Sequence, residues 1–373
     1  MSRRRMGSVI VFLVSLASAA RGSADPVGFI QQNLVSNVPG LAVVTDPQLV
    51  NPWGISFGPT SPFWIANNGT GVSTLYNGAG TKQGLVVTIP PAPGSPAGTT
   101  SAPTGTVFNP VAANFGGDRF LFATEDGTIA GWQGALGTTA AVRVDSAASG
   151  AAYKGLAIAG DRIFATDFGN GRIDAFDSSY APLLPGGGFT DPNLPAGYAP
   201  FGIQTIAGNL FVTFANKTPG SDDENHGPGL GFVDRFDTNG NLLQRLISGG
   251  ALDAPWGLAL APAGFGEFGG ALLVGNFGDG SINAYDPVTG ALLGTLLDPG
   301  GNPIAIEGLW GLSFGNAGPG FSPDRLYFTA GINEEHDGLF GSLQPVPEPG
   351  TLALMAGGLG LVLRRRRRTP QLL

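Results

Sequence analysis

The chain has 373 residues and no cysteine, which excludes disulfides, thiolate metal sites and thiol nucleophiles. Nine of its 19 lysines and arginines lie in the first 21 residues or in residues 364–368. The part of the chain between these clusters is therefore much more acidic than the formal net charge of −8 indicates. Without these two clusters, ten basic residues face 27 acidic ones, a net charge near −17, and nucleic acid is not expected as a partner.

The first predicted element is a secretory signal in residues 1–24. Three arginines at positions 3–5 precede an apolar run over residues 9–17, and the small residues that follow suit cleavage after Ala20 or Ala24. A buried N-terminal helix is the alternative, but it leaves the basic flank and the short apolar core unexplained. We therefore expect export.

A unit of about fifty residues then recurs six times. Each copy has a short apolar strand with a glycine, a second apolar strand, a polar glycine-rich loop and an aromatic strand; the first copy covers residues 51–57, 63–66, 67–71 and 73–77. The marker glycines are spaced 51, 50, 47, 55 and 54 residues apart: Gly54, Gly105, Gly155, Gly202, Gly257 and Gly311. Four short strands in about fifty residues form one propeller blade. The sequence therefore predicts an all-β fold, a six-bladed β-propeller.

The marker strands are expected to be innermost, because a small residue fits where neighbouring backbones crowd. They carry no charge beside their glycines except Lys154. Outer, fourth strands are predicted at residues 85–89, 141–145, 242–247 and 292–297. The stretch 90–103 is rich in Pro, Gly, Ala, Ser and Thr and is expected to be a surface loop.

The last unit is one strand short. It offers residues 308–314, 325–329 and 338–343, and the chain then runs into Pro345, Pro347 and Pro349, which a central strand does not tolerate. Residues 29–35, before the first unit, have strand character. We expect them to pair with residues 338–343 and so close the ring, because an exposed sheet edge invites aggregation.

Two sets of loops lie at the same end of a propeller channel. One set leads into the innermost strands, and the other connects the second and third strands of each blade. Five aromatic residues on the entry side are candidate ligand-binding residues of this channel mouth: Trp53, Tyr153, Phe201, Trp256 and Trp310. The alternative is that these side chains plug the channel and pack between blades, and the sequence favours this plug over ligand stacking.

The second set of loops is rich in oxygen and imidazole groups, and a hard cation such as calcium binds six to eight oxygens. The candidate metal ligands are Glu125, Asp126, Asp167, His226, Asn276, Glu334 and His336. Neither histidine-containing loop has the spacing of a calcium-binding hand. Zinc is a further alternative that would require the two histidines to converge with a carboxylate. Bound Ca²⁺ is therefore one hypothesis among several.

The C-terminus has three parts in order: Pro347-Glu-Pro-Gly350, an apolar stretch over residues 352–363, and five arginines at 364–368. This order resembles the PEP-CTERM sorting signal of Gram-negative bacteria. The resemblance implies processing by a membrane exosortase near Pro347, Glu348, Pro349 and Gly350, and a membrane association only through this C-terminal segment before processing. It also implies an extracytoplasmic or cell-surface location. The expected domains are thus 1–24 signal peptide, 25–344 propeller and 345–373 sorting signal.

The body also has a family resemblance. Residues 49–57, 308–314, 328–331 and 336–343 resemble an uncharacterised family of exported bacterial propellers, some with PEP-CTERM tails. The repeat is also similar to NHL-type and gluconolactonase-like propellers at the level of single blades. No activity comes with this resemblance.

Two functions follow as hypotheses. The first is a non-catalytic, exported binding module for a polysaccharide or a surface partner, since such sorting signals are linked to exopolysaccharide. The second is a calcium-dependent hydrolase or lactonase in which Glu125, Asp167, Asn276 or Glu334 hold the ion. No Gly-x-Ser-x-Gly elbow, phosphate-binding glycine loop or His-Glu-x-x-His motif is present.

Overall fold

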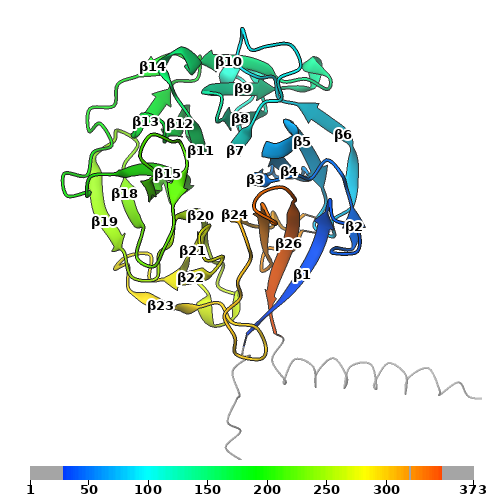
Figure 1. Cartoon of the computed structure of the whole chain (residues 1–373), viewed down its shortest axis with the longest axis vertical. Coiled ribbons are helices and arrows are strands. Elements are labelled where there is room, and N and C mark those ends of the chain that lie inside the picture. The colour runs from blue at the N-terminus through cyan, green and yellow to red at the C-terminus, as the bar shows by residue number, and fades with distance from the viewer. Residues whose placement is uncertain (1–27, 319–320, 347–373) are drawn as a thin grey trace, which may run out of the picture. The chain divides into compact units, whose positions relative to one another are not determined.

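Six small, mainly antiparallel sheets form a ring around a central channel (Figure 1). A computed structural model describes residues 28–318 and 321–346, which belong to one compact unit. The six sheets confirm the predicted propeller, with the blade number expected for NHL-type and gluconolactonase-like rings. The expected signal peptide and Pro347, Glu348, Pro349 and Gly350 of the expected sorting signal lie outside the described residues.

The first three blades follow the chain from the innermost strand outwards. Blade 1 comprises β3 (Pro52–Ser56), β4 (Phe63–Asn67), β5 (Val72–Tyr76) and β6 (Lys82–Thr88). Blade 2 comprises β7 (Pro103–Phe108), β8 (Phe120–Thr124), β9 (Thr128–Trp132) and β10 (Ala141–Asp145). Blade 3 comprises β11 (Tyr153–Ala159), β12 (Arg162–Asp167), β13 (Arg172–Phe176) and the two-residue β14 (Pro182–Leu183).

The last three blades include the insertion and the ring closure. Blade 4 comprises β15 (Tyr198–Ile206), β16 (Asn209–Lys217), β18 (Phe232–Phe236) and β19 (Leu242–Ser248), with β17 (Glu224–Asn225) paired to β16. Blade 5 comprises β20 (Pro255–Leu260), β21 (Leu272–Asn276), β22 (Ile282–Tyr285) and β23 (Leu292–Thr295). Blade 6 comprises β24 (Leu309–Phe314), β25 (Leu326–Ala330), β26 (Leu339–Pro345), β1 (Phe29–Ser36) and β2 (Val44–Thr45).

Helix is confined, in the described residues, to single 3₁₀ turns: Asn68–Thr70, Phe115–Gly117, Gly134–Leu136, Ala147–Ser149 and Gly266–Phe268. In these same ranges no helix is long and apolar enough to cross a membrane. The predicted fourth strands at residues 85–89, 141–145, 242–247 and 292–297 all correspond to outer strands, with ends shifted by a few residues. Residues 90–102 form a mostly exposed connection, as expected.

The marker glycines explain how the innermost strands close the ring. A Cβ on Gly54 would lie 2.4 Å from the carbonyl oxygen of Thr104 in blade 2, and one on Gly105 would lie 2.3 Å from the amide nitrogen of Leu156 in blade 3. The same relation continues around the circle until Gly311, whose Cβ would lie 2.6 Å from the carbonyl oxygen of Trp53 in blade 1. Only glycine allows backbones to approach so closely. The repeat is therefore a requirement of blade-to-blade contact.

The start of the chain closes the last blade, as predicted. Strand β1 runs antiparallel to β26, with Phe29 opposite Pro345 and Ser36 opposite Leu339. The Ser36 hydroxyl also donates to the carbonyl oxygen of Gly338 at 2.7 Å. Because β1 comes from the N-terminus and β26 from the C-terminus, this pairing fastens the ring without a disulfide.

Candidate ligand-binding site at the channel mouth

An aromatic layer closes one end of the channel. Trp53 and Trp310 stack at 3.5 Å between ring centroids, and Trp256 meets both edge-on at 6.1 and 5.7 Å. Phe201 packs edge-on against Trp310 at 5.8 Å. Trp53, Phe201 and Trp310 are buried, and Trp256 is half-buried. Four of the five predicted aromatic residues thus come together, in the arrangement expected of a plug.

Tyr153, the fifth predicted aromatic residue, lies elsewhere. Its ring packs in the apolar core shared with Leu156, Ile163 and neighbouring residues. Its hydroxyl donates to Asp174 at 2.9 Å. Successive residues of a strand point to opposite faces. The side chain of Tyr153 therefore lies in the interior of blade 3, and the side chain of Lys154 lies on the channel side.

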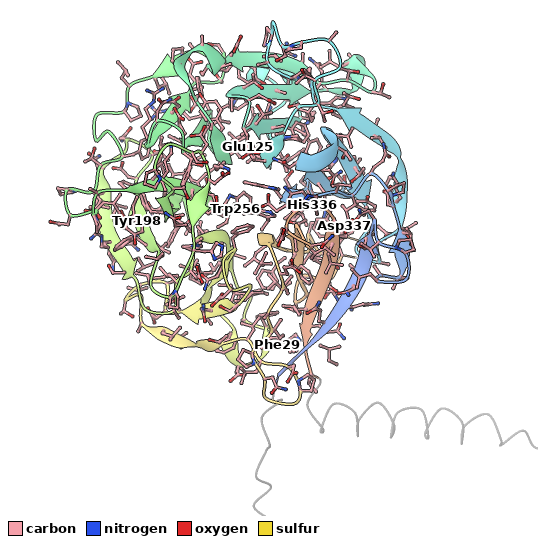
Figure 2. The ribbon with its side chains drawn as sticks, viewed as in Figure 1. Phe29, Glu125, Tyr198, Trp256, His336 and Asp337 are labelled. Carbon is pink, nitrogen blue, oxygen red and sulfur yellow. The ribbon has the colours of Figure 1, made fainter. Side chains whose placement is uncertain are left out.

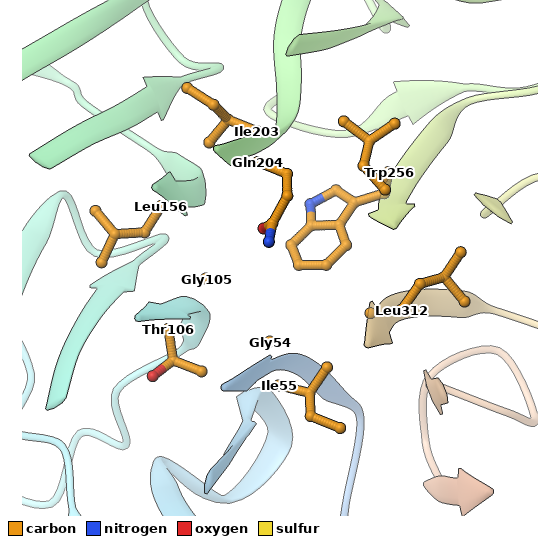
Figure 3. Close-up of a pocket in the computed structure, with 11 residues that line it drawn as sticks. Gly54, Ile55, Gly105, Thr106, Leu156, Ile203, Gln204, Trp256 and Leu312 are labelled. Atoms are coloured by element: carbon orange, nitrogen blue, oxygen red, sulfur yellow. The ribbon is translucent and has the colours of Figure 1, made fainter. Parts of the chain in front are cut away.

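The channel beneath the aromatic layer is narrow. Its cavity has a volume of about 30 Å³ and is lined by the innermost strands, including Gly54, Gly105, Thr106 and Gln204 (Figure 3). Such a volume holds one or two waters. A ligand at this end of the ring therefore has to bind above the tryptophans, at the mouth, where Figure 2 shows Glu125, Trp256 and His336 around the central opening.

Lys154 is the centre of the mouth. Its side chain is only 3% exposed, and its Nζ lies 2.5 Å from Oε1 of Glu125. The ammonium also lies over the rings of Trp53 at 5.1 Å and Phe168 at 5.9 Å, a cation–π arrangement that partly compensates for lost water. Trp256 Nε1 donates to the backbone oxygen of Lys154 at 3.1 Å. The aromatic layer thus forms the floor of a charged site.

A hydrogen-bond network extends from this ion pair across the mouth. Asn68 Nδ2 donates to Oε2 of Glu125 at 2.8 Å, and Asn51 Nδ2 donates to Oε2 of Glu335 at 3.3 Å. Trp310 Nε1 donates to Oδ1 of Asn51 at 3.1 Å. The hydrogen bonds therefore join side chains of blades 1, 2, 3 and 6. Glu224 of blade 4 acts on this set through its charge, and we call the whole group the mouth network: Asn51, Asn68, Glu125, Lys154, Glu224 and Glu335.

Glu335 reaches the mouth on an unusual loop. Asn333, Glu334 and Glu335 have φ values of 55°, 53° and 65°, so three successive non-glycine residues are left-handed. Each costs roughly 1–2 kcal/mol. Asp337 holds the loop by accepting hydrogen bonds from Asn37 at 2.5 Å and from Asn333 at 3.0 Å. Strain of this kind is retained where the surrounding contacts fix it.

Glu224 comes from the insertion after β16. Strand β17 folds back onto the end of β16, with Glu224 opposite Lys217. Burial raises the pKa of Glu224, and Lys154 only partly opposes this. Burial and the charges of Glu224 and Glu125 raise the pKa of Glu335 to about 7. Burial alone would lower the pKa of Lys154, but the charges of Glu125 and Glu224 outweigh it and the pKa is raised.

The mouth network thus has an excess of negative charge. Three carboxyl groups surround one ammonium. Burial is the largest cause of the raised pKa values of Glu224 and Glu335, and the charges of the neighbouring carboxylates add to it. Carboxylate and amide oxygens can accept hydrogen bonds from hydroxyl or ammonium groups, and the amide nitrogens can donate them. A carboxyl with a pKa near 7 can also exchange a proton at neutral pH.

The predicted metal ligands do not form one group. Glu125 belongs to the mouth network, whereas Asp126 accepts hydrogen bonds from Ser101 and Ala102, and Asp167 accepts them from Ala152 and Asn170. Asn276 donates to the carbonyl oxygen of Ala251, and three further predicted ligands have exposed side chains: His226, Glu334 and His336. In residues 28–318 and 321–346, no three histidine or carboxylate side chains converge on a possible metal position.

Five residues of the mouth network are not among the residues predicted from the sequence to bind a ligand or a metal: Asn51, Asn68, Lys154, Glu224 and Glu335. One signal was available, because Lys154 is the one charge beside a marker glycine. The other four lie in loops, and no local sequence pattern predicts the conformations of these loops.

The comparisons with known proteins agree with this fold. Residues 345–368 match the PEP-CTERM protein-sorting motif, which implies export and processing by an exosortase. An uncharacterized protein of Acanthamoeba polyphaga mimivirus is 35% identical over 328 residues, covering 83% of this chain and 78% of the viral protein. A second uncharacterized protein of that virus is 33% identical over 330 residues, covering 83% and 84%.

Solved structures share the fold alone. The PQQ-bound aldose sugar dehydrogenase of Streptomyces coelicolor has a TM-score of 0.51 at 14% identity, over 86% of this chain and 99% of that chain. The two viral relatives extend over most of the propeller at more than 30% identity. The chain therefore belongs to one protein family with these two mimivirus proteins, and it carries a PEP-CTERM sorting motif at its C-terminus.

Proposed function

We propose that this protein is an exported, non-catalytic binding module that an exosortase sorts to the extracytoplasmic space or cell surface of a Gram-negative bacterium. The mouth network is its ligand-binding site, and an extracellular polysaccharide is its ligand. The observation that carries this proposal is the hydrogen-bonded set of carboxyl and amide groups above the aromatic layer. These groups match the hydroxyl-rich surface of a sugar, and the half-buried Trp256 offers a ring for a sugar to contact.

The charge of the mouth narrows the class of polysaccharide. Glu125, Glu224 and Glu335 outnumber Lys154, so neutral sugars and sugars with a free amino group fit better than uronic acids. A uronate would bring a fourth carboxylate into a site where burial and neighbouring charges already raise the pKa of Glu335 to about 7.

A glycan array tests the proposal. The labelled full-length chain is applied to oligosaccharides of neutral, amino and uronic-acid sugars, together with Trp256→Ala and Asn68→Ala variants. We expect binding to neutral or amino sugars, weakened in both variants. Val288→Ala is the matched control, because Val288 is 66% exposed and lies in the turn between β22 and β23, whereas the mouth residues lie on entry loops and loops between second and third strands. Binding that neither mouth variant changes would refute the assignment.

A hydrolase is the second candidate, and the pKa of Glu335 near 7 favours it, since a general acid or base works best with a pKa near the operating pH. A calcium-dependent form with Glu125, Asp167, Asn276 or Glu334 as ligands lacks a converging ligand group in the described residues. Incubation of each bound oligosaccharide, with product analysis by mass spectrometry, separates the two functions: cleavage that Glu335→Gln abolishes would make the protein an enzyme.

We also propose the domain bounds 1–24 for the signal peptide, 25–344 for the propeller and 345–373 for the sorting signal. The matched motif at residues 345–368 supports the last of these. Mass spectrometry of the mature secreted protein checks both processed ends.

A further inference from the structure

A long connection leads from β14 of blade 3 to β15 of blade 4 (Figure 1), and we call it the strap: residues 184–197. Its first part is held by backbone hydrogen bonds, because the amides of Gly187 and Phe189 donate to carbonyl oxygens of the turn at 239–240 at 2.9 and 3.0 Å. Its middle has a side-chain anchor. The side chain of Asp191 is only 1% exposed, so it reaches into the interface between the two blades.

Asp191 forms a buried ionic group with two residues of blade 4. Asp234 of β18 has a side chain with no exposed surface, and Arg245 of β19 lies directly opposite Asp234 in the strand pairing. Arg245 Nη2 pairs with Oδ2 of Asp191, and Arg245 Nε lies 3.7 Å from Oδ1 of Asp234. Arg245 Nη1 also donates to the backbone oxygen of Asn193 in the strap at 3.0 Å. One guanidinium group therefore serves two carboxyl groups and the backbone of the strap.

The surroundings of this ionic group are apolar. Asp234 lies opposite Val212 of β16. Blade 3 and the strap contribute apolar side chains to the same interface: Phe164, Ile173, Ala175 and Phe189. Tyr198 of β15 also packs there, and burial raises the pKa of its hydroxyl above the ordinary value of 10. The charges that act on Asp234 are therefore those of Asp191 and Arg245.

Two ionised carboxylates beside one guanidinium would leave an uncompensated negative charge in this interface. Within the described residues, neither carboxylate oxygen of Asp234 has a hydrogen-bond partner. An ionised carboxylate buried in this way is costly, and two carboxyl groups that lie close together relieve the cost by sharing one proton. Burial and the charge of Asp191 raise the pKa of Asp234 to about 8, although Arg245 opposes this shift. Asp234 is therefore protonated at neutral pH and can donate to Asp191.

We propose that one proton, shared by Asp191 and Asp234, fastens the middle of the strap to blade 4, and that loss of this proton at alkaline pH releases residues 190–195. Without the proton, two buried carboxylates repel each other and only Arg245 compensates them. Asp234 stays in place because β18 is hydrogen-bonded to β16 on one side and to β19 on the other. The strap is therefore the part that moves. The proposal is independent of the mouth network.

Hydrogen exchange of the full-length chain tests the proposal, read by mass spectrometry on peptides that cover 190–195 from about pH 6 to about pH 9. The amides of Asn193 and Leu194 donate to oxygens of Asp191 at 2.8 and 3.1 Å, so release of the strap exposes them. The pKa of Asp234 is raised in the folded chain, so closure is strongest below its ordinary pKa of 3.8 and weakens as the pH rises to about 8. After correction for intrinsic exchange, we expect protection to fall about tenfold per pH unit up to about pH 8 and then to level off.

Two variants identify the carboxyl groups. Asp234→Asn replaces the shared proton by an amide hydrogen that can donate to Asp191 at any pH, so protection of 190–195 should no longer depend on pH. Asp191→Asn leaves Arg245 to pair with Asp234 alone, and it should also remove the alkaline loss of protection. Asp161→Asn, at an exposed aspartate in the turn between β11 and β12, is the matched control and should keep the pH dependence of the parent.

Several outcomes would overturn the proposal. Protection of 190–195 that stays constant between about pH 6 and about pH 9 in the parent would show that no proton fastens the strap. The same would follow from a pH dependence that persists in both Asp234→Asn and Asp191→Asn. A pH dependence that Glu335→Gln removes and Asp234→Asn retains would assign the titration to the mouth network. Protection lost equally in all blades would indicate global unfolding and not release of the strap.

Discussion

Replacement of Glu335 by glutamine should stabilise the protein at alkaline pH. The ordinary pKa of 4.5 is raised to about 7 in the folded chain by burial and by Glu224 and Glu125. Between these two pH values the folded state keeps a proton that the unfolded state has lost, so the free energy of unfolding falls as pH rises. At about 1.4 kcal/mol per pKa unit, Glu335 lowers stability above pH 7 by up to about 3 kcal/mol.

Glu335→Gln keeps an oxygen to accept the hydrogen bond from Asn51 and cannot ionise. We expect this variant to be more stable than the parent by about 1–3 kcal/mol at pH 8, with the difference vanishing near pH 4.5. Urea unfolding followed by tryptophan fluorescence at both pH values measures it. Glu334→Gln, at the exposed neighbouring residue, is the control and should change stability by less than about 0.5 kcal/mol. A Glu335→Gln variant no more stable than the parent at pH 8 would refute the reasoning.

Three further predictions concern the stability of the ring, measured by urea unfolding unless stated. Lys154→Met should destabilise the protein by about 3 kcal/mol, because Glu125 loses its ion-pair partner. Adding Glu125→Gln should recover part of that loss. Equal stability of the single and double variants would contradict this prediction. Asp118→Ala should lower the free energy of unfolding by about 3 kcal/mol, because buried Asp118 accepts hydrogen bonds from Arg143 at 2.6 and 2.8 Å and from Tyr180 at 2.7 Å. A loss of stability no larger than that of Tyr180→Phe would show that the Asp118–Arg143 ion pair contributes nothing. Val35→Asp places a charge at a fully buried position of β1 and should separate β1 from β26, so that limited proteolysis cuts near β26. Resistance to proteolysis equal to that of the parent would argue against closure of the ring by β1.

Much of the fold could be predicted from the sequence because one physical constraint repeats. Each marker glycine, from Gly54 to Gly311, allows one innermost strand to touch the next, so the spacing of glycines reports the number of blades. The closure by residues 29–35 followed from a missing strand and three prolines. The truncated β14 was the one outer strand in the first five blades for which the sequence offered no candidate, and the prolines beside Leu183 and Leu184 are the reason.

The site was less predictable. Trp53, Phe201, Trp256 and Trp310 were placed at the mouth by their position in the repeat, and they do meet there. Those four residues directly precede their marker glycines, whereas Tyr153 stands two residues before Gly155 and so lies on the opposite side of its strand, with Lys154 in the equivalent place. Glu335 depends on three left-handed residues, and Glu224 on an insertion that folds back onto β16. Neither conformation leaves a periodic signal, since both are determined by contacts with other blades.

The proposed function requires a glycan to occupy the mouth network. Carbodiimide labelling of carboxyl groups, read out by mass spectrometry with and without the glycan selected by the array, tests this occupancy most directly. Bound glycan should protect Glu224 and Glu335 from labelling and leave the exposed Glu334 labelled as before. Unchanged labelling of Glu224 and Glu335 at saturating glycan would place the ligand elsewhere and contradict the account.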